Sequence, residues 1–225
     1  SRVVMSELQL KKNISVLYAF SFFWLALVII PVIVPFFATK GLSLADVFVL
    51  QSVFALSVVV FEVPSGYLAD MIGRRRALIL GSVFHGVGFT LLCFAESFAG
   101  LALFEITVGL GMSLLSGSDL SLLYDSQLAL NMSPQEKTRG IARFRFIKAT
   151  AEGIAALLGG VLVLWSFDVV VYVNAIIAWV PLFLSFRLVE APYQRMQAES
   201  PLSNFRRILM HLFYRDSLLR LTTLA

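Results

Sequence analysis

The 225-residue chain has little charge, a single cysteine and two histidines. Charged residues make up only 14% of it, whereas a soluble domain averages roughly 25%. One cysteine, Cys93, excludes an internal disulfide, and with only two histidines a structural zinc site is not expected. Neither a Gly-rich phosphate loop nor a catalytic triad is present. We therefore expect neither an enzyme nor a bound cofactor.

Hydrophobic residues are abundant instead, at 59% of the chain, and they form long runs. The pI of 9.4 does not indicate a nucleic-acid partner, because the basic residues fall in short clusters between the apolar runs. Six runs are long enough to cross a bilayer. They are residues 14–37, 44–68, 77–94, 98–130, 141–165 and 169–186.

The placement of basic residues predicts how these spans are oriented. If the N-terminus is cytoplasmic, Lys40 is the one basic residue of 18 on the outer side. We therefore expect a multi-pass protein of the plasma membrane, such as a bacterial inner membrane. Four parts follow along the chain: a cytoplasmic leader (1–13), the transmembrane domain (14–186), a cytoplasmic linker with an amphipathic helix (187–215) and the possible start of a seventh span (216–225).

Two of the spans are expected to be irregular. Pro31 and Pro35 predict a kink near the far end of the first span. The fourth span would be roughly 50 Å long as a straight helix, against a hydrocarbon core of roughly 30 Å. It must therefore tilt, bend or protrude from the membrane.

The turn between the second and third spans carries a distinctive run that begins at Gly66 and ends in three arginines, Gly66-Tyr67-Leu68-Ala69-Asp70-Met71-Ile72-Gly73-Arg74-Arg75-Arg76. We expect Gly73 to take a backbone conformation that other residues resist, and Gly66 to allow close helix packing. Asp70 is placed to bind free backbone N–H groups or an arginine.

This run resembles the loop between helices two and three of the major facilitator superfamily (MFS) of transporters. The match holds at Gly66, Leu68, Ala69, Asp70, Gly73, Arg74 and Arg75. The resemblance implies an all-α polytopic membrane protein whose 225 residues form the N-terminal six-helix bundle, built from 3+3 inverted repeats. A second six-helix half would then come from the same chain or from a homodimer.

The resemblance also implies a role for the turn. In the family the aspartate and arginines of this loop form a cytoplasmic gate that stabilises the outward-open state. That role falls here on Gly66, Asp70, Gly73, Arg74, Arg75 and, at the inner end of span four, Asp125. Simple anchoring of the topology by positive charge is the alternative, and both can hold together.

Ionisable side chains at membrane depth are the other functional candidates, because a charge at the centre of a spanning helix costs at least about 2.5–3.5 kcal/mol. Glu105 lies two turns into span four from its outer end, near the middle of the bilayer and beside a stripe of small residues. It is expected to be either a proton-coupling group or a polar link between helices. Family members often carry an arginine there, so no family role is transferred to Glu105.

Three further groups lie within the spans. Glu152 is a second candidate for proton coupling or substrate binding, but we expect it to pair with Lys148 at i,i+4, which would lower the cost of its burial without any function. Glu62 is expected to form a hydrogen bond near the inner gate. His85 is expected to be a neutral histidine bonded to a backbone carbonyl rather than a proton relay.

Together these features predict a secondary transporter that exports a small organic or amphipathic, drug-like solute in exchange for protons. Its partners would be that solute, protons, the lipid bilayer and the second six-helix half. Two alternatives stay open. One is a uniporter or importer in which the acids only join helices, and the other is a half-transporter that serves as a membrane interaction or assembly subunit.

Overall fold

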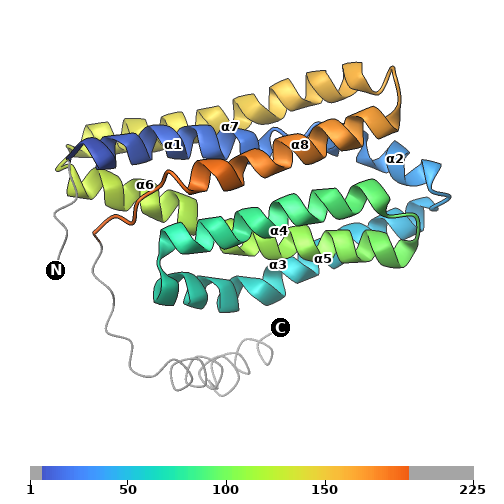
Figure 1. Cartoon of the computed structure of the whole chain (residues 1–225), viewed down its shortest axis with the longest axis horizontal. Coiled ribbons are helices and arrows are strands. Elements are labelled where there is room, and N and C mark those ends of the chain that lie inside the picture. The colour runs from blue at the N-terminus through green and yellow to red at the C-terminus, as the bar shows by residue number, and fades with distance from the viewer. Residues whose placement is uncertain (1–6, 193–225) are drawn as a thin grey trace, which may run out of the picture. The chain divides into compact units, whose positions relative to one another are not determined.

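A computed structural model describes residues 7–192, and these residues are helical, with no strand among them. The helices are α1 (Glu7–Leu25), a short 3-10 helix η1 (Ile30–Val32), α2 (Ile33–Thr39), α3 (Leu44–Ile72), α4 (Arg74–Phe94), α5 (Phe98–Leu115), α6 (Ser118–Ala129), α7 (Pro134–Leu162) and α8 (Phe167–Ser185) (Figure 1). The all-α prediction is confirmed. The amphipathic helix expected within 187–215 and the seventh span expected at 216–225 fall on residues 193–225, outside the described residues.

The six expected spans correspond to helical segments that run between two ends of the unit. Five segments are long and apolar enough to cross a membrane: Glu7–Thr39, Leu44–Ile72, Arg74–Phe94, Phe98–Ala129 and Phe167–Ser185. The sixth, α7, has 29 residues but carries several charges in its first half. Large apolar side chains point outward, among them Val59, Leu157 and Ile176. A surface of this kind suits lipid or another membrane segment.

The first span is interrupted between Leu25 and Ile30, which confirms a break but places it at mid-span rather than near the far end, and Pro35 lies inside α2. Pro31 has no N–H and its ring conflicts with the carbonyl of Leu27, so the α-helix ends before it. The backbone N–H of Ile29 instead binds Oδ1 of Asn174 on α8, at 3.2 Å. Gly159 of α7 packs directly against the Val28 carbonyl, where no side chain would fit. Irregular backbone at membrane depth is therefore covered by protein.

The fourth span bends, which is one of the three outcomes that its length allowed. The bend lies at Ser116 and Gly117, and Gly117 has φ of +77°. Beyond it, the carboxylate of Asp119 at the start of α6 pairs with Nζ of Lys148 on α7, at 2.6 Å. The expected pairing of Lys148 with Glu152 is therefore wrong. The physical reason is that Asp119 is almost fully buried and needs a counter-charge, whereas Glu152 is exposed.

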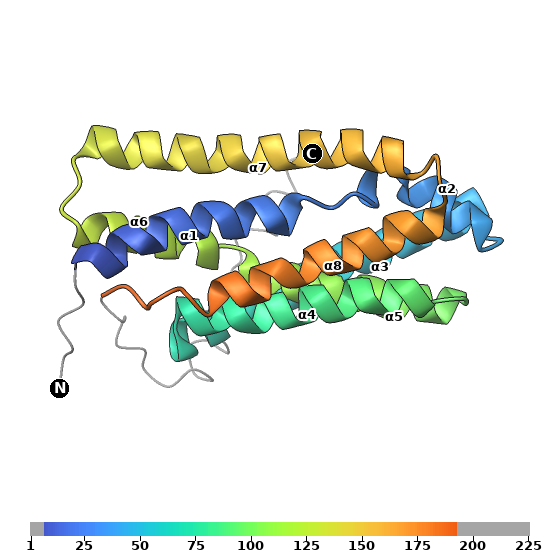
Figure 2. The same cartoon turned by 45° about the horizontal axis from the view of Figure 1, so that its top comes forward.

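Helix packing brings together segments that are distant in sequence. Helix α4 packs against α5 and α8, α3 packs against α5, and α1 packs against α6, α7 and α8 (Figure 2). Glycines permit the closest crossings. A Cβ added to Gly81 of α4 would lie 3.2 Å from the Gly111 carbonyl of α5, and one added to Gly86 would overlap the ring of Trp179 on α8.

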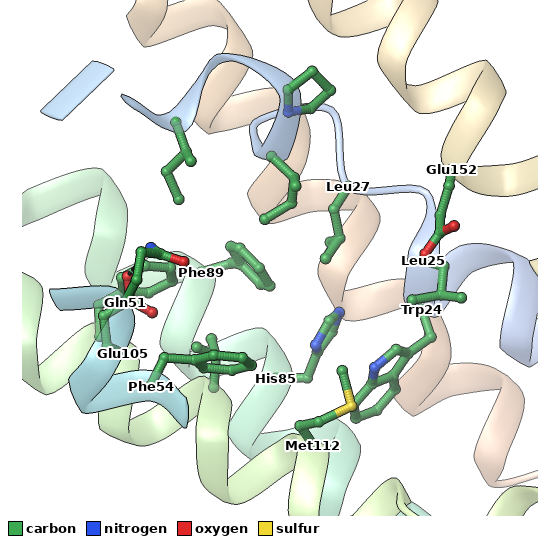
Figure 3. Close-up of a pocket in the computed structure, with 15 residues that line it drawn as sticks. Trp24, Leu25, Leu27, Gln51, Phe54, His85, Phe89, Glu105, Met112 and Glu152 are labelled. Atoms are coloured by element: carbon green, nitrogen blue, oxygen red, sulfur yellow. Dashed lines mark hydrogen bonds between the residues drawn. The ribbon is translucent and has the colours of Figure 1, made fainter. Parts of the chain in front are cut away.

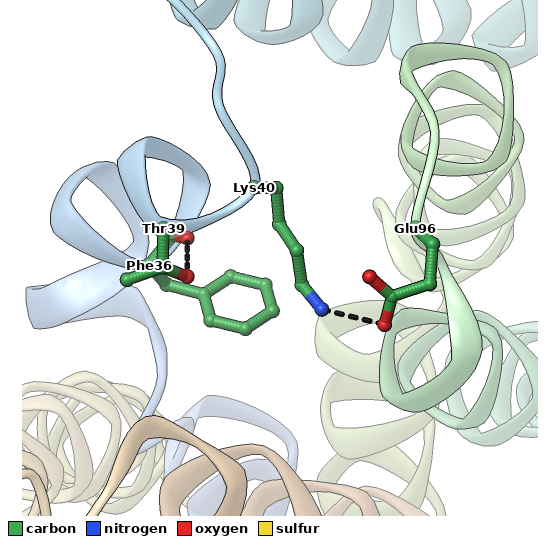
Figure 4. Close-up of polar contacts among 4 residues, drawn as sticks. All are labelled: Phe36, Thr39, Lys40 and Glu96. Atoms are coloured by element: carbon green, nitrogen blue, oxygen red, sulfur yellow. Dashed lines mark hydrogen bonds and ion pairs between the residues drawn. The ribbon is translucent and has the colours of Figure 1, made fainter.

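One ion pair joins two turns at the end of the unit opposite the three arginines. Lys40 Nζ lies 2.7 Å from Oε1 of Glu96, which connects the α2–α3 turn to the α4–α5 turn (Figure 4). The Lys40 ammonium also lies 5.6 Å from the ring centroid of Phe36. Since Glu96 is mostly exposed, this pair contributes at most about 1 kcal/mol to stability.

Candidate functional site

A cavity of about 340 Å³ lies among α1, the interrupted segment after it, α3, α4, α5 and α7 (Figure 3). Its volume falls in the range of roughly 300–1,000 Å³ that is typical of small-molecule pockets. Most of its wall is apolar, with aromatic rings from Trp24, Phe54, Phe89 and Phe104. Three of the four membrane-depth candidates line it, namely His85, Glu105 and Glu152, and Glu62 does not.

Glu105 is a buried carboxyl group on the cavity wall. It is 3% exposed, and its Oε1 accepts a hydrogen bond from Nε2 of Gln51 on α3, at 3.1 Å. One turn further along α5, Gly109 lets α3 approach so closely that an added Cβ would lie 2.8 Å from Cβ of Ser57. This close approach is what brings Gln51 to Glu105. The bond therefore links α3 to α5 beside the cavity.

Gln51 was not identified from the sequence. An amide in the middle of an apolar span is the signal that could have found it, because a buried amide also needs a partner. It carries no charge, however, and a search for ionisable groups passes over it.

His85 is 3% exposed and stacks on Trp24, with ring centroids 4.1 Å apart and an interplanar angle of 21°. Its Nε2 has no hydrogen-bond partner within residues 7–192. The expected bond to a backbone carbonyl is therefore absent at that atom, because the ring is turned into the cavity and flat against Trp24.

Glu152 reaches the cavity from α7, on the side opposite Gln51 and Glu105 in Figure 3. Its side chain is exposed and forms no hydrogen bond or ion pair with another residue of the described part. Glu62 lies away from the cavity. It accepts a hydrogen bond of 3.4 Å from Oγ of Ser116 at the bend between α5 and α6.

The turn between α3 and α4 forms a separate polar cluster. Asp70 Oδ1 lies 2.7 Å from the guanidinium of Arg74, one of the two partners that the sequence allowed for it. Gly73 has φ of +98° and ψ of 154°, so its expected unusual conformation is confirmed. Arg75 donates through Nε to the Leu188 carbonyl at 2.6 Å, which ties the turn to the segment after α8.

Glu190 completes this cluster and was missed. Its two carboxylate oxygens accept from the backbone N–H groups of Arg74 and Arg75, at 2.7 and 2.9 Å, and so cap the N-terminus of α4. Asn13 of α1 positions it by bonding both the carbonyl and the N–H of the adjacent Val189. An acid just after the last span, facing three arginines across the bundle, is the signal that could have found it.

Two members of the expected gate behave differently from the rest. Gly66 makes no close helix contact within residues 7–192, since an added Cβ would meet no atom of this part within 4 Å. The expected close packing is therefore wrong for the described residues, because no other described helix approaches α3 closely at this position. Asp125 is half-buried on α6 and forms no ion pair with a described residue, although the charges of Arg74 and Glu190 are close enough to act on its carboxyl group.

Comparison with known proteins decides the family. Residues 14–225 match the model described as Major Facilitator Superfamily. The chain belongs to this superfamily. It is thus a multi-pass membrane protein of a transporter family, and the resemblance carried by residues 66–76 extends over nearly the whole chain.

Two curated relatives match part of the chain, and one solved structure shares its fold. The relatives are the "Multidrug resistance protein Stp" of two Mycobacterium tuberculosis strains, CDC 1551 and H37Rv. Each is 30% identical over 138 residues, which cover 61% of this chain and 25% of the relative. The structure is a peptide transporter POT (E310Q mutant) in complex with sulfate, with a TM-score of 0.67 and 16% identity. The likeness covers 95% of this chain and 45% of that one, so this chain spans less than half of the transporter structure.

Proposed function

We propose that the protein is a secondary transporter that exports a small organic or amphipathic solute in exchange for protons, with Glu105 as the proton acceptor. The observation that carries the proposal is a carboxyl group, 3% exposed, on the wall of an apolar cavity at membrane depth. Export is supported by the two mycobacterial relatives, which are named as multidrug resistance proteins.

Protonation of Glu105 would bias the conformation through the cost of burying charge. The ionised form carries a negative charge that the neutral form lacks. This charge has a high free energy against an apolar wall and a low one in contact with water. Gln51 suits both forms, because its NH₂ donates to a carboxylate and its carbonyl can accept from a carboxylic acid. The ionised form would then favour a conformation in which water reaches Glu105, and the neutral form one in which it does not.

The cluster at the α3–α4 turn would act as the gate at the cytoplasmic end. In this proposal Gly66, Asp70, Gly73, Arg74, Arg75 and Asp125, together with Glu190, stabilise the outward-open state. The leader would lie in the cytoplasm and the protein in the plasma membrane of a bacterium. A second six-helix half, from the same chain or another copy, would close the cavity.

The test uses inverted membrane vesicles that contain the natural gene product. The vesicles are energised to an acidic interior, and a fluorescent amine reports the pH gradient. We expect added amphipathic solutes that are transported to dissipate the gradient in wild-type vesicles, and Glu105→Gln to lower this response at least tenfold. Glu96→Gln, the same change in an exposed turn, serves as the control. A Glu105→Gln protein with unchanged solute-driven proton flux and pH profile would refute the assignment.

A uniporter or importer is the second candidate, favoured by the hydrogen bond between Gln51 and Glu105. In this case the bond only joins α3 to α5. Radiolabelled solute uptake that a protonophore does not alter would support it, and would exclude proton coupling.

A further inference from the structure

The charged groups of the cavity are of one sign. Glu105 and Glu152 line it, together with His85, and no lysine or arginine from the described residues does so. The rest of the wall is apolar and aromatic, apart from the Gln51 amide. An anionic solute would meet two carboxylates there without a compensating cation.

The two carboxyl groups are in different situations. Glu105 is buried and bonded to Gln51, whereas Glu152 is exposed to the cavity and has no partner among residues 7–192. The cation one turn away on α7, Lys148, is occupied by Asp119 and so does not neutralise Glu152. The cavity thus offers an uncompensated carboxylate at one side and a buried, bonded carboxyl at the other (Figure 3).

His85 gives a second, independent indication of a ligand. Its Nε2 is a polar atom on the cavity wall, is buried and lacks a partner within the described part of the chain. Buried polar atoms in folded proteins nearly always have a hydrogen-bond partner. A ligand atom at this place would supply one.

We propose that this cavity binds amphipathic organic cations, with Glu152 as the counter-charge. The inference rests on the proposed function in taking this cavity as the transport site. An ammonium group that leaves water needs an anionic partner, which Glu152 provides at little further cost because it is already unpaired. The apolar part of the solute would lie against the rings of Phe54 and Phe89, and Glu105 stays available for the proton.

The test compares equilibrium binding of three probes to the natural gene product in lipid nanodiscs by calorimetry. The probes are an aryl trimethylammonium ion, its tert-butyl carbon isostere and an aryl sulfonate, which share one apolar body and differ in charge. We expect the wild type to bind the cation at least tenfold more tightly than the isostere. Glu152→Gln should remove most of this preference, while Glu152→Asp and the control Glu96→Gln should retain it.

Equal binding of cation and isostere by the wild type, or an unchanged preference in Glu152→Gln, would overturn the inference. If Glu152→Asp retains the preference for the cation, position 152 accepts a different side chain. A loss of that preference in Glu152→Gln is then due to the missing charge. The experiment needs no gradient and is therefore separate from the proposed function. Cation binding without gradient-driven transport would refute only proton-coupled export, and proton-driven transport of neutral solutes alone would refute only the cation site.

Discussion

Gly73 meets two demands at the turn between α3 and α4. Its φ of +98° and ψ of 154° lie in a region that glycine alone occupies readily. An added Cβ would also lie 2.7 Å from Oε2 of Glu190, the carboxylate that caps α4. Backbone conformation and helix cap therefore both require the absence of a side chain at this position.

We expect Gly73→Ala to destabilise the protein by about 1–3 kcal/mol, from backbone strain and displacement of the Glu190 cap. Gly66→Ala is the matched control, since Gly66 is helical and has open space around its Cα, so alanine there should be neutral or slightly stabilising. Thermal unfolding of both variants in the same detergent makes the comparison. Equal loss of stability in the two variants would contradict this account of the turn.

The sequence identified some residues of the candidate site and missed others. Glu105, Glu152 and His85 were selected because ionisable groups at membrane depth are costly, and all three line one cavity. Glu62 met the same criterion yet lies away from the cavity. The depth of a residue within a predicted span does not show whether its side of the helix faces the bundle interior. Gln51 and Glu190 were missed because each acts through a partner more than fifty residues away in the chain.

At the scale of elements, the two interrupted spans were predictable but their geometry was not. Proline content and span length indicated a kink and a bend. The positions depend on tertiary partners, namely Asn174, which binds the freed N–H of Ile29, and Lys148, which pairs with Asp119 just after the bend. Such partners lie on other helices, and a pattern within one span cannot identify them.

The pair of Asp119 and Lys148 connects α6 to α7. Removing Lys148 alone should cost more stability than removing both partners. We expect Lys148→Met to cost about 3 kcal/mol, because it leaves the nearly buried Asp119 carboxylate without a counter-charge. The double variant with Asp119→Asn should recover most of that loss. A double-mutant cycle by thermal unfolding measures the coupling, and additive effects of the two changes would show that the pair contributes nothing.

At the scale of the whole molecule, the orientation in the membrane follows from the unequal placement of basic residues. The end with the α3–α4 turn holds the arginine cluster, and the opposite end holds Lys40, paired with Glu96. The proposed cytoplasmic N-terminus places the first of these ends inside. The six spans were evident from hydropathy. The cavity was not, because it forms only where α1, the interrupted segment after it, α3, α4, α5 and α7 pack together.

Single-cysteine labelling tests this orientation directly. In a Cys93→Ser background, we expect a membrane-impermeant maleimide added to intact cells to label Ala38→Cys, which is exposed at the Lys40 end, and not Gln135→Cys, which is exposed at the arginine end. Permeabilised cells, in which both should react, provide the control. Labelling of Gln135→Cys alone in intact cells would invert the topology.

Infrared difference spectroscopy can show whether Glu105 gains and loses a proton, as the proposed function requires. Neutral carboxyl and carboxylate groups absorb at distinct frequencies, so spectra of the purified protein at acidic and alkaline pH report the titrating groups without a solute. We expect the wild type to lose neutral-carboxyl absorption as the pH rises, with contributions from all of its titrating acids. Glu105→Gln should lack the component of a buried carboxyl group that is hydrogen-bonded to an amide, and Glu96→Gln should keep that component. An identical difference spectrum for wild type and Glu105→Gln would contradict the claim.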